Sequence, residues 1–333
     1  MLLEAYMFKK EYELLKKIGI VPVIALDAVD DAVPLANALL SGGIKAMEIT
    51  FRNPSDYEGT AASIRAVSQQ VQGMYVGAGT VTNVALAKLA VDSGAQFVVS
   101  PGCKEDVVDY CIAHNIVIYP GVNTASEITA AVSKGLSVLK YFPAEVSGGV
   151  AMLKALAGPF PDVQFLPSGG LDAENVGDYL ALSNVAAISG SWMIKKNLIK
   201  GKQWNEIVKL SQAAVRVSLG FAFAHVGINF QNERECASSV KKLEAFGFAG
   251  DEKSESWFCG TEFEMMKQPG PGKNGHIGIY TYSVPRALEY LAQYGYEPVW
   301  DAAKWAGKPH VSELIFIYLA GDVGGFSVHL KKR

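Results

Sequence analysis

A single lysine, Lys140, interrupts an otherwise apolar, strand-like run over residues 138–142. An ammonium group inside a strand is costly unless it finds a partner or loses its proton. Burial favours the neutral amine, and a neutral lysine is a nucleophile toward carbonyl carbon. The run therefore leaves two interpretations open: Lys140 forms an imine with a substrate, or it reaches solvent at the strand end and pairs with Glu145.

The elements that must position this lysine recur eight times over the first two-thirds of the chain. Each is a short apolar run followed by an Ala/Leu-rich stretch, as buried parallel strands and their helices require. Good helix caps support the pattern, with Thr82 and Asn83 before one helix and Asn123 and Thr124 before another. We predict a (β/α)8 TIM barrel; a doubly wound sheet is the alternative, but the glycine fingerprint after the first strand is missing. The eight runs cover residues 20–26, 44–50, 74–77, 96–100, 116–120, 138–142, 163–167 and 185–189.

The carboxyl ends of barrel strands carry the active site, and polar residues follow several of these runs. Alternation along the second run places Glu48 on the side of Thr50, where it can meet Lys140. A carboxylate beside an imine-forming lysine is suited to moving protons. Ser168-Gly169-Gly170 and Gly190-Ser191 follow the last two runs, where barrels often bind phosphate through backbone N–H groups.

At this point the first two-thirds of the chain resembles a known family. Residues 8 to about 212 are similar to the bacterial 2-keto-3-deoxy-6-phosphogluconate (KDPG) and 4-hydroxy-2-oxoglutarate (KHG) aldolases. The matching stretches are Ile20-Val-Pro-Val-Ile24, Met47-Glu-Ile-Thr-Phe-Arg52, Val76-Gly-Ala-Gly-Thr-Val81, Gly94-Ala-Gln-Phe-Val-Val-Ser-Pro101, Pro120-Gly-Val, Leu139-Lys-Tyr-Phe-Pro-Ala-Glu145, Gly158-Pro-Phe-Pro and Pro167-Ser-Gly-Gly.

The resemblance implies a class I aldolase that releases pyruvate and glyceraldehyde 3-phosphate from KDPG, or pyruvate and glyoxylate from KHG. Lys140 would form the imine and Glu48 would move protons through water, with no cofactor or metal needed. The resemblance also implies a homotrimer. Two departures are visible: Ala25 stands where some members have Arg, and Ser168 where Thr is usual. The expected substrate-binding residues are Arg52 and Thr80 near the pyruvate carboxylate, Gly169, Gly170 and Ser191 near a phosphate, and Pro101, Ser168 and Gly190 at the same strand ends.

The last third of the chain repeats itself. Residues 224–228 match residues 275–279, and a helix-like stretch follows each of them, over 236–248 and 286–296. Each copy closes on a strand, at 263–267 and at 328–332. This pattern predicts an α+β domain of paired βαβββ modules, each of roughly 50–60 residues.

These modules resemble the glyoxalase/bleomycin-resistance/dioxygenase superfamily, the vicinal oxygen chelate proteins. The resemblance places four donors around a divalent metal, for which zinc, nickel, iron(II) and manganese are all suitable. Other hypotheses stay open: a small-molecule sensor or oligomerisation module, or a separate sugar-acid isomerase or epimerase beside a degenerate or regulatory barrel. The four donors are His225, Glu264, His276 and His329.

Length and composition bound the remaining classes. The 333 residues suffice for an aldolase barrel over 1–215 and a second domain over 222–333. A net charge of −3 gives no electrostatic case for nucleic acid, and no apolar run reaches membrane-spanning length. The four cysteines form no disulfide pattern, so we expect a cytoplasmic protein. The N-terminal segment predicts an amphipathic helix with Leu14, Leu15 and Ile18 on one side.

Overall fold

The computed structural model describes residues 7–307 and 313–333. The chain divides into two compact units, with the boundary between Ser218 and Leu219.

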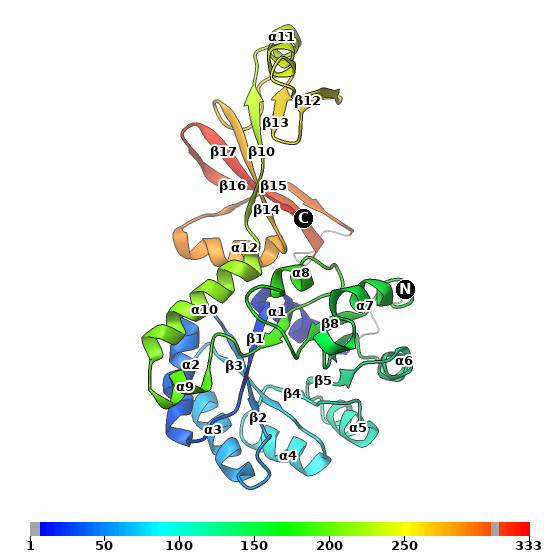
Figure 1. Cartoon of the computed structure of the whole chain (residues 1–333), viewed down its shortest axis with the longest axis vertical. Helices are drawn as coiled ribbons and strands as arrows, with labels where there is room; N and C mark the ends of the chain where they lie inside the picture. The colour runs from blue at the N-terminus through cyan, green and yellow to red at the C-terminus, as the bar shows by residue number, and fades with distance from the viewer. Residues whose placement is uncertain (1–6, 308–312) are drawn as a thin grey trace. The chain divides into compact units, whose positions relative to one another are not determined.

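The first unit alternates strands and helices, with the helices placed around the strands (Figure 1). Its strands are β1 (Ile20–Ile24), β2 (Ala46–Thr50), β3 (Tyr75–Gly79), β4 (Phe97–Val99), β5 (Ile118–Tyr119), β6 (Gly121–Val122), β7 (Val138–Tyr141), β8 (Gln164–Pro167) and β9 (Ile188–Gly190). Its helices are α1 (Lys9–Ile18), α2 (Ala32–Ser41), α3 (Tyr57–Gln70), α4 (Val84–Asp92), α5 (Glu105–Ala113), α6 (Ala125–Ser133), α7 (Gly149–Leu156), α8 (Val176–Leu180), α9 (Lys196–Lys200) and α10 (Trp204–Leu219), which crosses the boundary.

The strands of the first unit form a closed parallel arrangement. One sheet has the order β5-β4-β3-β2-β1-β9 and a second the order β6-β7-β8. Two isolated bridges, Phe165 with Val185 and Ser168 with Ser189, join the β8 region to the β9 region. All strand pairings among the described residues of this unit are parallel, so the unit is a (β/α)8-like α/β fold, as predicted.

The fifth predicted strand, over residues 116–120, is wrong in its extent. The structure has two short strands there, β5 and β6, separated at Pro120. Proline has no N–H to donate to a neighbouring strand, so the ladder is interrupted at that position. The carbonyl of Pro120 still accepts a hydrogen bond from the Lys140 N–H at 2.9 Å, which ties this region to β7.

Local capping fixes two of the barrel helices at the predicted residues. The Asn83 side chain accepts a hydrogen bond from the Leu86 N–H at the start of α4. Thr124 and Glu127 form a reciprocal capping box at the start of α6. The prediction that Leu14 lies on the buried side of α1 was wrong, because this side chain is 41% exposed. The buried residues of α1 are Tyr12 and Leu15.

The second unit contains the predicted repeat of strand, helix and three strands, once in each half. The first half comprises β10 (Ala222–Asn229), α11 (Glu233–Glu244), β11 (Gly250–Glu252), β12 (Ser256–Cys259) and β13 (Phe263–Met266). The second comprises β14 (Gly275–Thr281), α12 (Val284–Leu291), β15 (Pro298–Trp305), β16 (Leu314–Val323) and β17 (Phe326–Lys332). Short 3-10 helices lie at Val29–Asp31, Glu145–Ser147 and Ala292–Tyr294.

One eight-stranded sheet runs through both halves, in the order β11-β12-β13-β10-β14-β17-β16-β15. The halves are therefore mirror-ordered about an antiparallel seam between β10 and β14. In the first half α11 packs on one sheet face, in a core built from Cys236, Val240, Cys259 and Met265.

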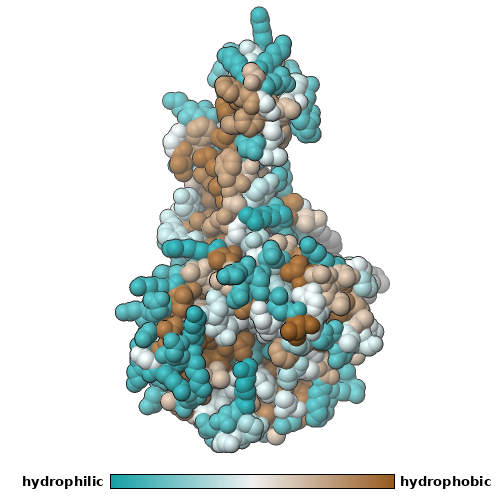
Figure 2. Space-filling view, in the orientation of Figure 1, coloured by the Kyte–Doolittle hydropathy of each residue, from teal (hydrophilic) through white to brown (hydrophobic). Residues whose placement is uncertain are grey.

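Apolar surface is prominent on the second unit. Figure 2 shows apolar side chains gathered over its strands in the view drawn. The exposed large apolar or aromatic side chains of this unit are Phe221, Phe223, Phe246, Tyr294, Tyr296, Val299, Trp300 and Val323. Among the described helices of the whole chain, none combines the length and apolar character that crossing a membrane requires.

Gly77 tests the packing inside the barrel sheet. A Cβ added there would lie 2.3 Å from the buried ring of Phe97 on β4, whereas nothing lies within 4 Å of a Cβ at Gly102. We expect Gly77→Ala to destabilise the protein by about 1–3 kcal/mol through overpacking. Gly102→Ala should change stability by no more than about 0.5 kcal/mol. Guanidinium unfolding followed by circular dichroism checks this, and equal midpoints for the two variants would contradict it.

Candidate active site and candidate metal centre

Lys140 and Glu48 form a buried ion pair between β7 and β2. Their side chains are 7% and 1% exposed, and Nζ lies 3.8 Å from Oε1 of Glu48. That separation is an ion-pair distance, longer than a direct hydrogen bond. Lys140 therefore neither reaches solvent nor pairs with Glu145, whose carboxylate instead accepts a hydrogen bond from the Tyr179 hydroxyl.

The environment of Glu48 favours its protonated form. Burial raises the pKa of Glu48 above its ordinary value, while the charges of Lys140 and Arg52 oppose that shift. Neither carboxylate oxygen of Glu48 accepts a hydrogen bond from the residues that the structure describes. A carboxyl group that has a raised pKa, accepts no hydrogen bond from the described residues and lies beside an amine is suited to accept and return a proton.

Gly79 at the end of β3 makes the space that Glu48 occupies. A Cβ at residue 79 would lie 1.9 Å from Oε1 of Glu48, closer than any real contact. Thr80 follows with φ of 57°, a left-handed conformation that costs a β-branched residue roughly 1–3 kcal/mol. Strained residues of this kind are often found at functional sites. The stretch Val76–Val81 belongs to the family resemblance and Thr80 was expected near the substrate, but Gly79 was missed as a positioning residue.

The loop after β8 presents backbone N–H groups. The carbonyls of Ser168 and Gly169 accept hydrogen bonds from the N–H groups of Ala144 and Glu145, at 2.8 and 3.1 Å. The Gly170 carbonyl accepts one from the side chain of Asn175. Gly169 and Gly170 have φ of 97° and 83°, and their own N–H groups donate to no described residue. The loop thus has its carbonyls engaged and two amide donors available for an anion.

The other predicted substrate-binding residues lie at neighbouring strand ends. Arg52 is exposed just after β2, and Pro101 is exposed just after β4. Gly190 ends β9, where a Cβ would lie 2.3 Å from the ring of Trp192, and Ser191 follows it, exposed. Among the described residues, no hydrogen bond or ion pair joins Thr80, Pro101 or Ser191 to the Lys140–Glu48 pair.

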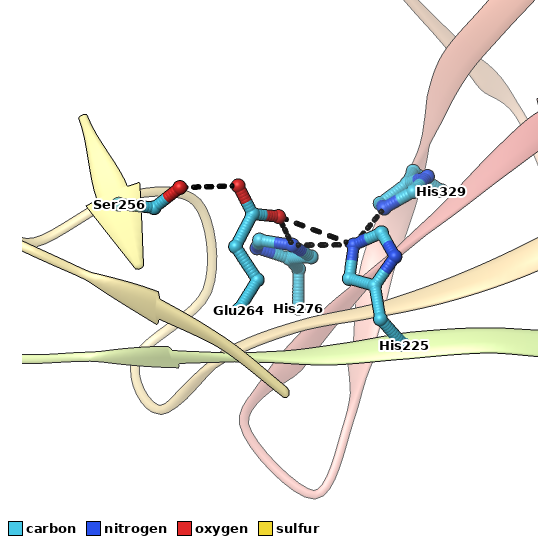
Figure 3. Close-up of polar contacts among 5 residues, drawn as sticks. All are labelled: His225, Ser256, Glu264, His276 and His329. Atoms are coloured by element: carbon cyan, nitrogen blue, oxygen red, sulfur yellow. Dashed lines mark hydrogen bonds and ion pairs between the residues drawn. The ribbon is translucent and has the colours of Figure 1, made fainter. Parts of the chain in front are cut away.

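The second unit brings its four predicted donors together. Figure 3 shows the side chains of His225, His276, His329 and Glu264 pointing toward one another from four neighbouring strands. The His225 Nε2 atom lies 3.1 Å from His276 Nε2 and 3.3 Å from His329 Nε2. Oε2 of Glu264 lies 3.2 Å from His225 Nε2 and 3.1 Å from His276 Nε2. All three imidazoles are buried.

These separations fit the edges of a metal coordination shell. For metal–ligand bonds of about 2.1 Å, neighbouring ligands lie about 3.0 Å apart in an octahedron and about 3.4 Å apart in a tetrahedron. The measured separations of 3.1 to 3.3 Å fall between these values. A neutral imidazole has only one N–H, so three converging Nε2 atoms are readily satisfied by a cation at their centre.

The surroundings of Glu264 and His329 shift the pKa values of both groups. Burial alone would raise the pKa of Glu264, but hydrogen bonds with His225, His276 and Ser256 outweigh it and hold that pKa well below its ordinary range. Burial, together with the other two histidines, lowers the pKa of His329 to about 3. An ionised carboxylate and a neutral imidazole are the forms that bind metal.

Two glycines open the space for the imidazoles across the seam. A Cβ at Gly227 would lie 2.1 Å from the His276 ring, and one at Gly278 would lie 2.9 Å from the rings of His225 and His329. Sequence reasoning missed Ser256, whose hydroxyl donates to Oε1 of Glu264 at 2.9 Å. Its signal lies in the pairing of β12 with β13, which a local pattern does not contain.

A buried lysine beside a carboxyl group at the strand ends of a (β/α)8-like barrel is an arrangement suited to imine chemistry at a carbonyl. The family model described as KDPG and KHG aldolase matches residues 12–210. The chain belongs to this family, and it is an aldolase, a carbon–carbon lyase.

Individual relatives agree with this assignment over the first unit. A 2-dehydro-3-deoxy-phosphogluconate aldolase of Treponema pallidum is 43% identical over 206 residues, which cover 62% of this chain and 96% of that protein. The KHG/KDPG aldolase of Escherichia coli K12 is 40% identical, over 59% of this chain and 90% of that protein. A crystal structure of the Legionella pneumophila KDPG aldolase, with pyruvate captured as a covalent carbinolamine, matches with a TM-score of 0.58 and 34% identity, over 61% of this chain and 97% of that chain.

The space at Gly79 generates a prediction. In Gly79→Ala the new methyl group displaces the Glu48 carboxylate, so we expect kcat for aldol cleavage to fall by about 10²-fold, the usual weight of acid–base catalysis. Lys140 is not touched by the substitution, so borohydride with pyruvate should still label it. An unchanged kcat in folded protein would show that the position of Glu48 does not matter.

Proposed function

We propose that Lys140 is the imine-forming residue of this aldolase and that Glu48 is its acid–base partner. The observation that carries the proposal is their ion pair of 3.8 Å, with both side chains almost fully buried. Burial keeps the amine out of bulk water, so few solvent molecules compete with it for a bound carbonyl carbon. The aldolase activity is assigned to residues 1–215 and the remaining functions of the chain to residues 222–333.

The proposed reaction follows from these two groups. The amine of Lys140 attacks the C2 ketone of the substrate. The carbinolamine oxygen then takes a proton from Glu48 and leaves as water, which gives an iminium ion that accepts electrons. Glu48, through a water molecule, takes the C4 hydroxyl proton; the C3–C4 bond breaks, its electrons pass to the iminium, and the aldehyde leaves. The resulting enamine is protonated at C3, and hydrolysis returns pyruvate and the free lysine.

The substrate is proposed to be a 2-oxo acid with a distal anionic group, KDPG or KHG. The free N–H groups of Gly169 and Gly170 support a phosphate at that distal position, which favours KDPG. Arg52, which acts on Glu48 electrostatically, is proposed to lie near the substrate carboxylate with Thr80. Pro101, Ser168, Gly190 and Ser191 complete the proposed binding surface. The homotrimer and the cytoplasmic location stay predictions.

Chemical trapping tests the proposed lysine. Borohydride reduction of the full chain with pyruvate should give one pyruvyl adduct, which peptide mass spectrometry locates at Lys140. Lys140→Arg should lose both the adduct and aldol cleavage down to background, because an always-protonated guanidinium does not attack a carbonyl. Lys154→Arg, on the exposed side of α7, is the matched control and should keep both. An adduct that persists in Lys140→Arg would assign the chemistry to another lysine.

We further propose that His225, His276, His329 and Glu264 hold a divalent metal ion in a domain of the vicinal oxygen chelate type. Support comes from their donor separations and from the paired βαβββ order. A bound divalent ion would supply Lewis acidity toward ligand oxygens. The chain's own contribution is to fix three imidazoles and one carboxylate around one point.

Metal content tests this second proposal. The full chain should bind one equivalent of Zn²⁺ or Co²⁺, measured by equilibrium dialysis and elemental analysis. Glu264→Gln and His276→Ala should each weaken binding by at least about 10²-fold, since each removes a direct ligand. His114→Ala is the control, because His114 lies exposed against the Tyr110 ring in the first unit, and it should bind metal normally. Equal metal content in all four proteins would contradict the proposed donors.

A further inference from the structure

The sheet face that carries the metal donors is the one turned away from the helices. Met265 packs in the α11 core, so its strand neighbour Glu264 projects from the opposite face. In the second half, Ile317 and Leu330 are fully buried, and their neighbours Tyr318 and His329 alternate with them. We call this opposite face, with its histidines and Glu264, the donor face.

A row of cationic and aromatic residues crosses the donor face beside the donors. Lys331 lies two residues after His329 on β17, so both project from the same face. Across the sheet, Lys331 is paired with Tyr280 on β14 and with Phe316 on β16, and Phe316 is paired with Lys304 on β15. Directly opposed residues of paired strands share a face. We call Lys304 and Lys331, with Phe316 between them, the cationic strip.

Ring contacts confirm that these side chains lie together. The Lys304 Nζ atom is 4.9 Å from the centre of the Phe316 ring, and Lys331 Nζ is 5.9 Å from the centre of the Tyr280 ring. The Phe316 ring centre is in turn 4.6 Å from that of His329. The strip is therefore continuous with the donor cluster, about 7 Å along the strand from His329, which is one pleat repeat.

The two lysines of the strip contact aromatic rings, and their ammonium groups have no carboxylate partner in the part of the chain that the structure describes. Neither Lys304 nor Lys331 forms an ion pair with a carboxylate among residues 7–307 and 313–333. Both are exposed, and each has an aromatic ring as its neighbour. Two exposed ammonium groups on the same face as three buried imidazoles make this surface attractive to an anion.

We propose that the donor face binds a 2-oxo dicarboxylate, with its 2-oxo acid end at the His/Glu cluster and its distal carboxylate on the cationic strip. This inference rests on the proposed metal site. The 2-oxo acid end offers two oxygens to a cation whose four protein ligands carry only one negative charge. A five-carbon 2-oxo dicarboxylate is long enough to reach across the separation of about 7 Å between the cluster and the strip. Pyruvate has no second anionic group to place on the strip.

The test uses the full chain loaded with Co²⁺ on a Lys140→Arg background, so that the barrel forms no imine. The visible absorption of the cobalt site reports ligand binding at the second unit alone. We expect 2-oxoglutarate to bind about tenfold or more tightly than pyruvate, from two charge-assisted contacts. In the double variant Lys304→Met/Lys331→Met this preference should fall to about one, while cobalt content and pyruvate binding stay as they were.

Lys332→Met is the matched control, because Lys332 is the next residue of β17 and projects from the other face. It should keep the preference for 2-oxoglutarate. Equal binding of the two acids by the parent protein, or a preference that survives the double variant, would overturn the role of the strip while leaving the metal site intact. A parent protein that takes up no cobalt would overturn the metal site and, with it, this inference.

Discussion

The buried pair of Lys140 and Glu48 sets the requirements for the rest of the first unit. Two charged groups removed from water are tolerated only where the surrounding strands hold them in contact. The pair joins β2 to β7, strands that come from opposite halves of the barrel sequence. The closed order of strands is therefore what brings the carboxyl group to the amine. Burial then serves the chemistry directly, because the same desolvation that opposes the charges raises the pKa of Glu48.

Both candidate sites use glycine for the same physical purpose. Gly79 leaves the space that Glu48 fills, and Gly227 and Gly278 leave the space for the imidazoles of the second unit. Large polar side chains in a packed interior need an equal volume given up nearby. At these three positions the missing side chain is a structural part of the site, and none of the three lies in a turn.

Much of the architecture was predictable because it depends on local patterns. The eight apolar runs marked the barrel strands, and the repeated His-x-Gly segments at 225–227 and 276–278 marked equivalent strands of the second unit. What local patterns did not contain was register between distant strands. The partnership of Ser256 with Glu264, the row from Lys331 to Lys304, and the place of Gly79 beneath Glu48 all depend on such register. Leu14 was misplaced for a related reason, since apolar periodicity alone does not say which flank of a stripe the core covers.

The seam between β10 and β14 divides the donor set equally. His225 and Glu264 come from one half of the sheet, and His276 and His329 from the other, at equivalent positions. Each half supplies only two of the four donors, so a cation bound there would join the two halves of the sheet. Glu264 and His329 occupy equivalent positions in their modules yet differ in charge, so the donor set is asymmetric about the seam. The strand order is symmetric about the seam, but the negative charge of the donor set lies on one side of it.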